Sequence, residues 1–192
     1  MIGLLPSTLT VGGFSYKIRT DFRTILQIME AFEDPELRDF EKQHILIDIL
    51  FYEPETIPEE HYEEAVKEAV KFIDLGKEPT NKKAPHPSPV MSWSQDEQLI
   101  FSSLNSVAGK ETRETEYMHW WTFMGYYNEI KDGLFQFVVS IRQKLNSGQK
   151  LEKHEKEFLK ANPELIYIQK QLTEEEKKEK AEIDAMFDAL FY

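Results

Sequence analysis

Apolar residues that recur every three or four positions run through most of this chain. This spacing constrains its fold more than any other feature, because it places those residues on one face of an α-helix. The first such stretch follows Thr20 and Asp21, either of which can cap a helix. Its apolar face consists of Phe22, Ile25, Leu26, Met29 and Phe32. The pattern predicts a mainly α protein.

Two further helices are expected before residue 77. Asp34-Pro35 predicts an N-cap followed by proline in the first helical position. The helix that follows contains a nearly continuous apolar run over residues 45–51, which we expect at the centre of the N-terminal core. A third helix should open at Pro58 and end at Gly76, where glycine suits a left-handed cap.

One segment departs from helical spacing. Apolar and polar residues alternate over Leu9–Val11 and over Phe14–Ile18, with Gly12-Gly13 between them. Two glycines can adopt the positive φ angles of a type I′ turn, so the segment predicts a short β-hairpin. An isolated hairpin is only marginally stable, and we therefore expect this one to pack on the helices.

Prolines concentrate in residues 77–92 and disfavour helix there, which predicts a linker. The chain then divides into an acidic lobe of hairpin and helices at 1–76, the linker, a helical bundle lobe at 93–148 and a charged helical tail at 149–192. Residues 1–76 contain 16 acidic and 7 basic residues and so carry −9 of the chain's −12 net charge.

Three helices with short connections are expected in the second lobe, which suits an antiparallel bundle. A capping box from Ser94 to Glu97 precedes the first. The second should start near Thr115 and stop at Asp132-Gly133, and the third should run to Ser147-Gly148.

The tail is expected to be helical after a second capping box from Thr173 to Glu176. It ends in an apolar stripe made of Ile183, Met186, Phe187 and Leu190, with Phe191 beside it. A stripe of this kind either docks on its own domain or binds another molecule, and the sequence leaves both open.

Residues that carry catalytic chemistry are scarce. The absence of cysteine excludes disulfides, cysteine-ligated zinc and thiolate catalysis, and the glycines form no phosphate-binding loop. Glu116 and His119 have the spacing of a di-iron carboxylate site, but such a site needs a second copy that the chain lacks. We expect no metal, no cofactor and no enzyme activity, and we expect Trp120-Trp121 to serve packing rather than a ligand cage.

Charge and hydropathy also limit the partners. An acidic chain does not suit a nucleic-acid backbone, whose affinity for proteins comes mainly from lysine and arginine. No apolar run approaches about 18 residues and the N-terminus has no basic segment, so we expect neither a membrane span nor secretion.

Two blocks together give the chain a family resemblance. The first is Gly12-Gly13 followed by Tyr16–Arg23, and the second is His119–Phe123 followed by Gly133-Leu134 and Ile141–Leu145. These blocks resemble the bacteriophage Gp15 protein family, tail-gene products of long-tailed phages, over roughly residues 1–160.

The resemblance implies a tail assembly chaperone that binds and coats the tape measure protein before the tail tube polymerises. It would act in the cytoplasm of the bacterial host, be absent from or scarce in the mature virion, and self-associate head to tail. Partner contacts are expected at Trp120, Trp121, Ile183, Met186, Phe187, Leu190 and Phe191.

Two other functions are open. The protein could remain in the particle as a minor structural tail or virion component. Alternatively, its acidic N-terminal part could act as an adaptor that inhibits a host DNA-binding partner, although a solvated acidic surface is the commoner reason for such charge.

Overall fold

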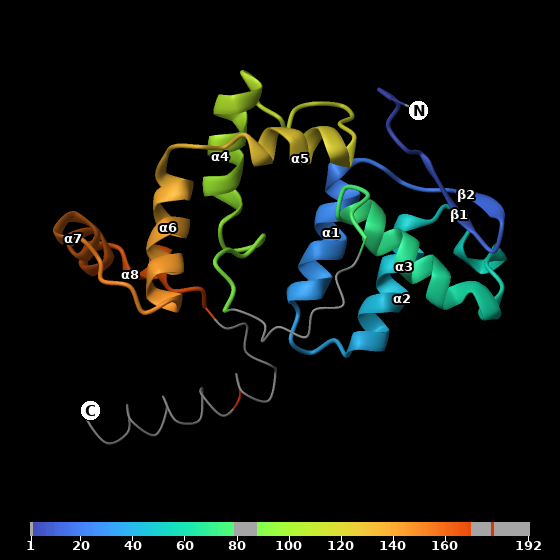
Figure 1. Ribbon diagram of the computed structural model, residues 1–192, viewed down its shortest axis with the longest axis horizontal. Coiled ribbons are helices and arrows are strands. Elements are labelled where there is room, and N and C mark those ends of the chain that lie inside the picture. Colours follow the sequence, from blue (N-terminus) through green and yellow to red (C-terminus); the bar gives the residue numbers. More distant parts are fainter. Residues whose placement is uncertain (1, 79–87, 170–177, 179–192) are drawn as a thin grey trace.

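The computed structural model describes residues 2–78, 88–169 and 178, and it is mainly α-helical with one short β-hairpin, as predicted (Figure 1). The N-terminal elements are β1 (Thr8–Val11), β2 (Phe14–Lys17), α1 (Phe22–Glu33), α2 (Asp39–Leu50) and α3 (Tyr62–Ile73), with single 3₁₀ turns at Pro54–Thr56 and Glu59–His61. The later elements are α4 (Glu97–Ala108), α5 (Trp120–Asn128), α6 (Leu134–Asn146), α7 (Lys153–Ala161) and α8 (Pro163–Ile166).

The hairpin has the predicted two-glycine turn. Gly12 and Gly13 have φ angles of 57° and 81°, and Thr8 pairs with Lys17 at the open end of the antiparallel ladder. The hairpin packs on the helices through its last β1 residue, Val11, which is fully buried. The Gly12 backbone N–H also donates to the Glu64 carboxylate of α3 at 3.0 Å.

The larger of two hydrophobic clusters among the described residues joins residues from both sides of the proline-rich segment. The stacked rings of Phe22 in α1 and Phe123 in α5 lie 4.7 Å apart at its centre. The largest fully buried side chains are Trp120, Phe22, Phe51, Phe72, Phe123 and Phe135. The proposed linker falls mostly at 79–87, outside the described residues, and the division into lobes stays a prediction about folding units.

In Figure 1 the hairpin and α1–α3 occupy one side and α6–α8 the other, with α4 between them and α5 crossing from α4 to α1. A smaller apolar cluster of Val138, Ile141 and Ile166 holds α6 against α8. On α7 the Phe158 ring lies 5.0 Å from that of Phe137 of α6, so both of these described tail helices pack on α6.

Two helix starts differ from those predicted in the first lobe. The helix expected at Pro35 begins at Asp39: the Asp34 carboxylate accepts the Glu36 N–H at 2.8 Å, as an N-cap would, but this turn does not continue, and Glu41 accepts the Arg38 N–H at 2.8 Å at the observed helix start. The helix expected at Pro58 begins at Tyr62, after the 3₁₀ turn.

Two more helix starts differ from those predicted in the second lobe. Ser94 does not cap α4, since its hydroxyl donates to Glu33 of α1 at 3.1 Å, and the N-cap is Asp96. The helix expected near Thr115 begins at Trp120, because the residues just before it are extended and pair with the start of α1.

Candidate functional site

The two sequence blocks, far apart along the chain, meet in space. The Phe22 N–H donates to the Met118 carbonyl at 3.0 Å, and the Trp120 N–H donates to the Thr20 carbonyl at 2.7 Å. Between these bonds Asp21 and His119 form an isolated antiparallel bridge. The segments that lead into α1 and α5 are therefore held as a short two-stranded pairing.

Each residue of this bridge also caps a helix. The Asp21 carboxylate accepts the Arg23 N–H at 3.0 Å at the start of α1 and the Met118 N–H at 3.1 Å. His119 Nδ1 accepts the Trp121 N–H at 3.0 Å at the start of α5. Its Nε2 then carries the proton and donates to the Pro6 carbonyl at 2.8 Å.

These bonds occupy both ring nitrogens of His119. The ring lies edge-on to Phe72 and Trp121, so it is packed among aromatic side chains. Glu116 and His119 do not share a helix face, because both precede α5. Across the residues that the structure describes, no group of His, Asp and Glu side chains is arranged to hold a metal ion.

The tryptophan doublet ties α5 to the end of α3. The Trp120 indole donates to the Ile73 carbonyl and the Trp121 indole to the Phe72 carbonyl, each at 2.9 Å. These carbonyls belong to the last turn of α3, where the regular helical hydrogen bonds run out, and the Phe72 carbonyl also accepts the Leu75 N–H at 3.1 Å. Trp120 is 1% exposed and Trp121 is half-buried, so the doublet serves packing, and Trp120 has almost no surface to offer to a partner.

The last segment of the second block, Ile141–Leu145, lies on α6 and contributes a buried arginine. The Arg142 guanidinium forms two hydrogen bonds with the Asp96 carboxylate and also donates to the carbonyls of Val90, Leu165 and Ile166. Arg142 thereby joins α6 to the start of α4 and to α8. Asp96 and burial raise the pKa of the nearby Tyr127 hydroxyl to about 12, with burial the larger cause.

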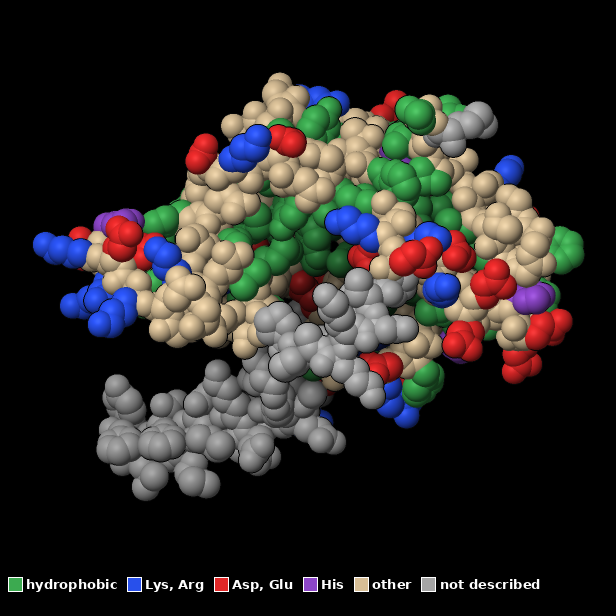
Figure 2. All heavy atoms as spheres, viewed as in Figure 1, with side chains coloured by type: hydrophobic (Ala, Val, Ile, Leu, Met, Phe, Trp, Pro, Cys, Tyr) green, Lys and Arg blue, Asp and Glu red, His purple; other side chains and the backbone are tan. Residues whose placement is uncertain are grey.

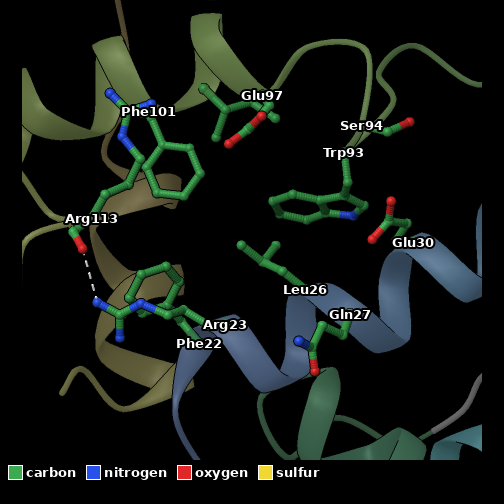
Figure 3. Close-up of a pocket in the computed structure, with 11 residues that line it drawn as sticks. Phe22, Arg23, Leu26, Gln27, Glu30, Trp93, Ser94, Glu97, Phe101 and Arg113 are labelled. Atoms are coloured by element: carbon green, nitrogen blue, oxygen red, sulfur yellow. Dashed lines mark hydrogen bonds between the residues drawn. The ribbon is translucent and has the colours of Figure 1, made fainter. Parts of the chain in front are cut away.

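Beside the two blocks lies an apolar groove between α1 and α4, with a volume of about 450 Å³. Figure 2 shows hydrophobic side chains gathered in this hollow on the face that carries α1 and α4. Phe22, Ile100 and Phe101 are buried and form its floor, and the half-buried Leu26 and Trp93 form its walls (Figure 3).

The rim of the groove is charged. The Arg23 guanidinium lies 4.5 Å from the Phe22 ring centre and the Arg113 guanidinium 5.1 Å from that of Phe101, so both mark one end. Arg23 also pairs with Asp21, and Arg113 pairs with Glu111, whose pKa it lowers to about 2. Glu97 and, near Trp93, Glu30 lie on the remaining rim (Figure 3).

Glu30 and Glu97 are exposed, and no lysine or arginine in the described part of the chain forms an ion pair with either. The groove thus combines an apolar interior with an acidic stretch of rim. This combination suits a segment that presents an apolar face flanked by basic residues.

The sequence interpretation missed this groove. The sequence pattern predicts no role for Trp93, because a single tryptophan before a helix start has no periodic pattern to place it. Of the residues expected to contact partners, the structure places Trp120 and Trp121 in or beside the core. Ile183, Met186, Phe187, Leu190 and Phe191 lie outside the described residues.

No helix in the described ranges is both long and apolar enough to cross a membrane.

Comparison with known proteins decides the family. Residues 1–168 match the family described as Bacteriophage Gp15 protein. The chain belongs to the bacteriophage Gp15 protein family. No curated protein and no solved structure matches it. The Gp15 match includes both blocks, the groove and α8, and it ends before the apolar stripe of the tail.

Proposed function

We propose that this Gp15 protein is a phage tail assembly chaperone that binds and coats the tape measure protein before the tail tube polymerises. Family membership over residues 1–168 carries the proposal, since the Gp15 resemblance implies this role in long-tailed phages. The protein acts as a binding protein without catalysis, in the cytoplasm of the bacterial host, and is absent from or scarce in the mature virion.

The groove between α1 and α4 supports this function. A tape measure protein is a long chain of amphipathic helices, which aggregate when their apolar faces stay exposed to water. One such helix can lay its apolar face against Leu26 and Trp93 while its basic residues approach Glu30 and Glu97. The net charge of −9 over residues 1–76 favours encounter with basic client segments.

Coating a long client requires many copies, so we propose head-to-tail self-association through two different patches. Besides the groove, the hairpin and the residues next to it offer an apolar patch, on the side of the molecule opposite to α6–α8. There Phe14 is 65% exposed and Tyr52 is 57% exposed. Both line a hollow that also includes Tyr16 and Phe51.

Co-expression with the tape measure protein tests the proposal. We expect the tape measure protein to be soluble with the native chain and insoluble without it. Leu26→Lys places a charge inside the groove and should lower the soluble yield of the tape measure protein. The matched control is Lys67→Ala on the exposed face of α3, which should leave that yield unchanged. Equal insolubility with and without the native chain would contradict the proposal.

Mass spectrometry of purified particles separates the chaperone from a structural tail component. A chaperone should be missing or present in far fewer copies than the tube subunit. A fixed stoichiometric amount in the particle would favour the structural role.

A further inference from the structure

The described residues leave the groove between α1 and α4 open to solvent. Its interior is lined by aromatic and aliphatic side chains, and its volume of about 450 Å³ lies in the ~300–1,000 Å³ range of pockets that accept a ligand. Leu26 and Trp93 are each only half-buried. Covering them would remove further apolar surface from water.

The chain leaves the described structure beside this groove. The Gln169 backbone N–H donates to the Gln95 side-chain oxygen at 2.8 Å, and the Gln95 amide donates to the Tyr167 carbonyl at 3.0 Å. Gln95 directly follows Ser94, which lines the groove. Gln169 also lines a small cavity with Glu33, the last residue of α1, so the chain leaves at the end of the groove where α1 ends.

We propose that the C-terminal segment Ile183–Tyr192 of the same chain occupies this groove. Its apolar stripe has the three-and-four spacing that fits a helix against a groove. The 13 residues 170–182 connect Gln169 to the segment. They span about 20 Å if helical and up to about 45 Å if fully extended. Glu30 and Arg23 are separated along α1 by only about 10 Å, so either length allows the segment to reach the groove.

The tether favours this contact within one chain over the same contact between two chains. A short connection gives the second binding site an effective concentration of about 1 mM, well above the micromolar concentration of separate molecules. The segment therefore fills its own groove before it fills that of a neighbour.

A basic residue before the stripe and an acidic residue within it suit the two ends of the groove, with the acidic Glu182 and Asp184 between them. Glu30 lies at the end where the chain leaves, and Arg23 and Arg113 lie at the far end (Figure 3). Lys180 comes before the apolar stripe and Asp188 lies within it. A helical segment running antiparallel to α1 places Lys180 near Glu30 and, about 12 Å further on, Asp188 near Arg113.

The segment and a client helix then compete for the same groove. A client helix binds there only if it displaces the segment, so the segment lowers the client's apparent affinity for the groove. That consequence for the client rests on the proposed function, whereas the contact between segment and groove does not.

Disulfide trapping in the full chain tests the contact, because the chain contains no cysteine. Gln27→Cys on the groove wall is paired with Phe187→Cys, and the control pairs Lys67→Cys on α3 with Phe187→Cys. After mild oxidation at micromolar concentration, mass spectrometry of the cross-linked peptides measures the rate of each disulfide. Circular dichroism of both reduced proteins verifies that they fold alike.

We expect the disulfide between positions 27 and 187 to form within one chain at least ten times faster than the one between 67 and 187. Exchanging the charges in Lys180→Asp with Asp188→Lys should slow it about threefold. Equal rates for the two pairs would overturn the proposal, and so would cross-links that join two chains. The experiment uses no client, so its failure leaves the proposed function standing, and failure of the co-expression test leaves the contact standing.

Discussion

Arg142 and Asp96 form a two-point ion pair inside the protein, with Nη1 2.6 Å from Oδ2 and Nη2 2.9 Å from Oδ1. The two side chains are 3% and 2% exposed. The guanidinium N–H groups that do not bond to Asp96 donate to the carbonyls of Val90, Leu165 and Ile166. The pair therefore fixes the relative placement of α4, α6 and α8, next to the groove wall.

Removing one partner of this pair should be strongly destabilising. Asp96→Ala leaves the Arg142 charge buried without its counter-ion, and we expect the free energy of unfolding to fall by about 3–5 kcal/mol. The control is Glu129→Ala, which breaks the exposed pair with Lys131 and should change stability by less than about 1 kcal/mol. Urea unfolding followed by circular dichroism measures both, and equal losses would refute the structural role of the buried pair.

The indole bonds to α3 give a second prediction. Trp120→Phe removes the donor to the Ile73 carbonyl and some buried volume, so we expect a loss of about 2–4 kcal/mol. Trp93→Phe is the matched change, since the Trp93 indole donates no hydrogen bond among the described residues and lies in the groove. Trp93→Phe should lower the free energy of unfolding by less than half as much as Trp120→Phe. A larger loss for Trp93→Phe would show that the doublet does not hold α5 to α3.

The hairpin turn gives a third prediction. A Cβ on Gly12 would lie 2.5 Å from the His61 ring, whereas one on Gly13 would meet nothing within 4 Å. Both residues have positive φ angles, so both alanine variants carry a backbone penalty of about 1 kcal/mol. Thermal unfolding should show Gly12→Ala to be the less stable of the two. The same melting temperature for both variants would mean that the His61 contact is unimportant.

Glu155 should make stability depend on pH in the acid range. Its carboxylate, 5% exposed, lies 2.5 Å from Lys144 Nζ, and the hydrogen bond from Lys144 is the main cause that holds its pKa below the ordinary 4.5. A lowered folded-state pKa stabilises the protein above pH 4.5, and this contribution is lost as the pH falls through the folded value.

Glu155→Gln removes that linkage. We therefore expect the variant to be less stable than the native chain at pH 7, with the difference shrinking as the pH falls below about 4.5. Glu157→Gln, an exposed neighbour on α7, is the control and should follow the native pH profile. A stability difference that stays constant between pH 7 and pH 3 would contradict the assignment.

Local spacing was sufficient to predict the mainly α fold, the hairpin and its turn. The φ angles of Gly12 and Gly13 and the left-handed cap at Gly109 follow from glycine's own conformational freedom. The start of α5 did not follow from local signals, because Met118 and His119 bond to the segment before α1 instead of entering a helix.

The groove was beyond sequence reasoning for a similar reason. Phe22 and Trp93 come from parts of the chain that only the tertiary fold brings together, and no periodic pattern relates them. Ser94 was expected to cap α4, but the nearby Glu33 carboxylate takes its hydroxyl. The residues that carry the family resemblance also make contacts that hold the fold, as the bonds of Asp21 and His119 show.

The molar mass of the complex formed by co-expression with the tape measure protein tests the chaperone function most directly. Light scattering after size exclusion should give one soluble species whose mass corresponds to one tape measure chain and many copies of this 22.6 kDa protein. If the two proteins elute apart and the tape measure protein precipitates as it does alone, the protein does not coat it and the proposed function is wrong.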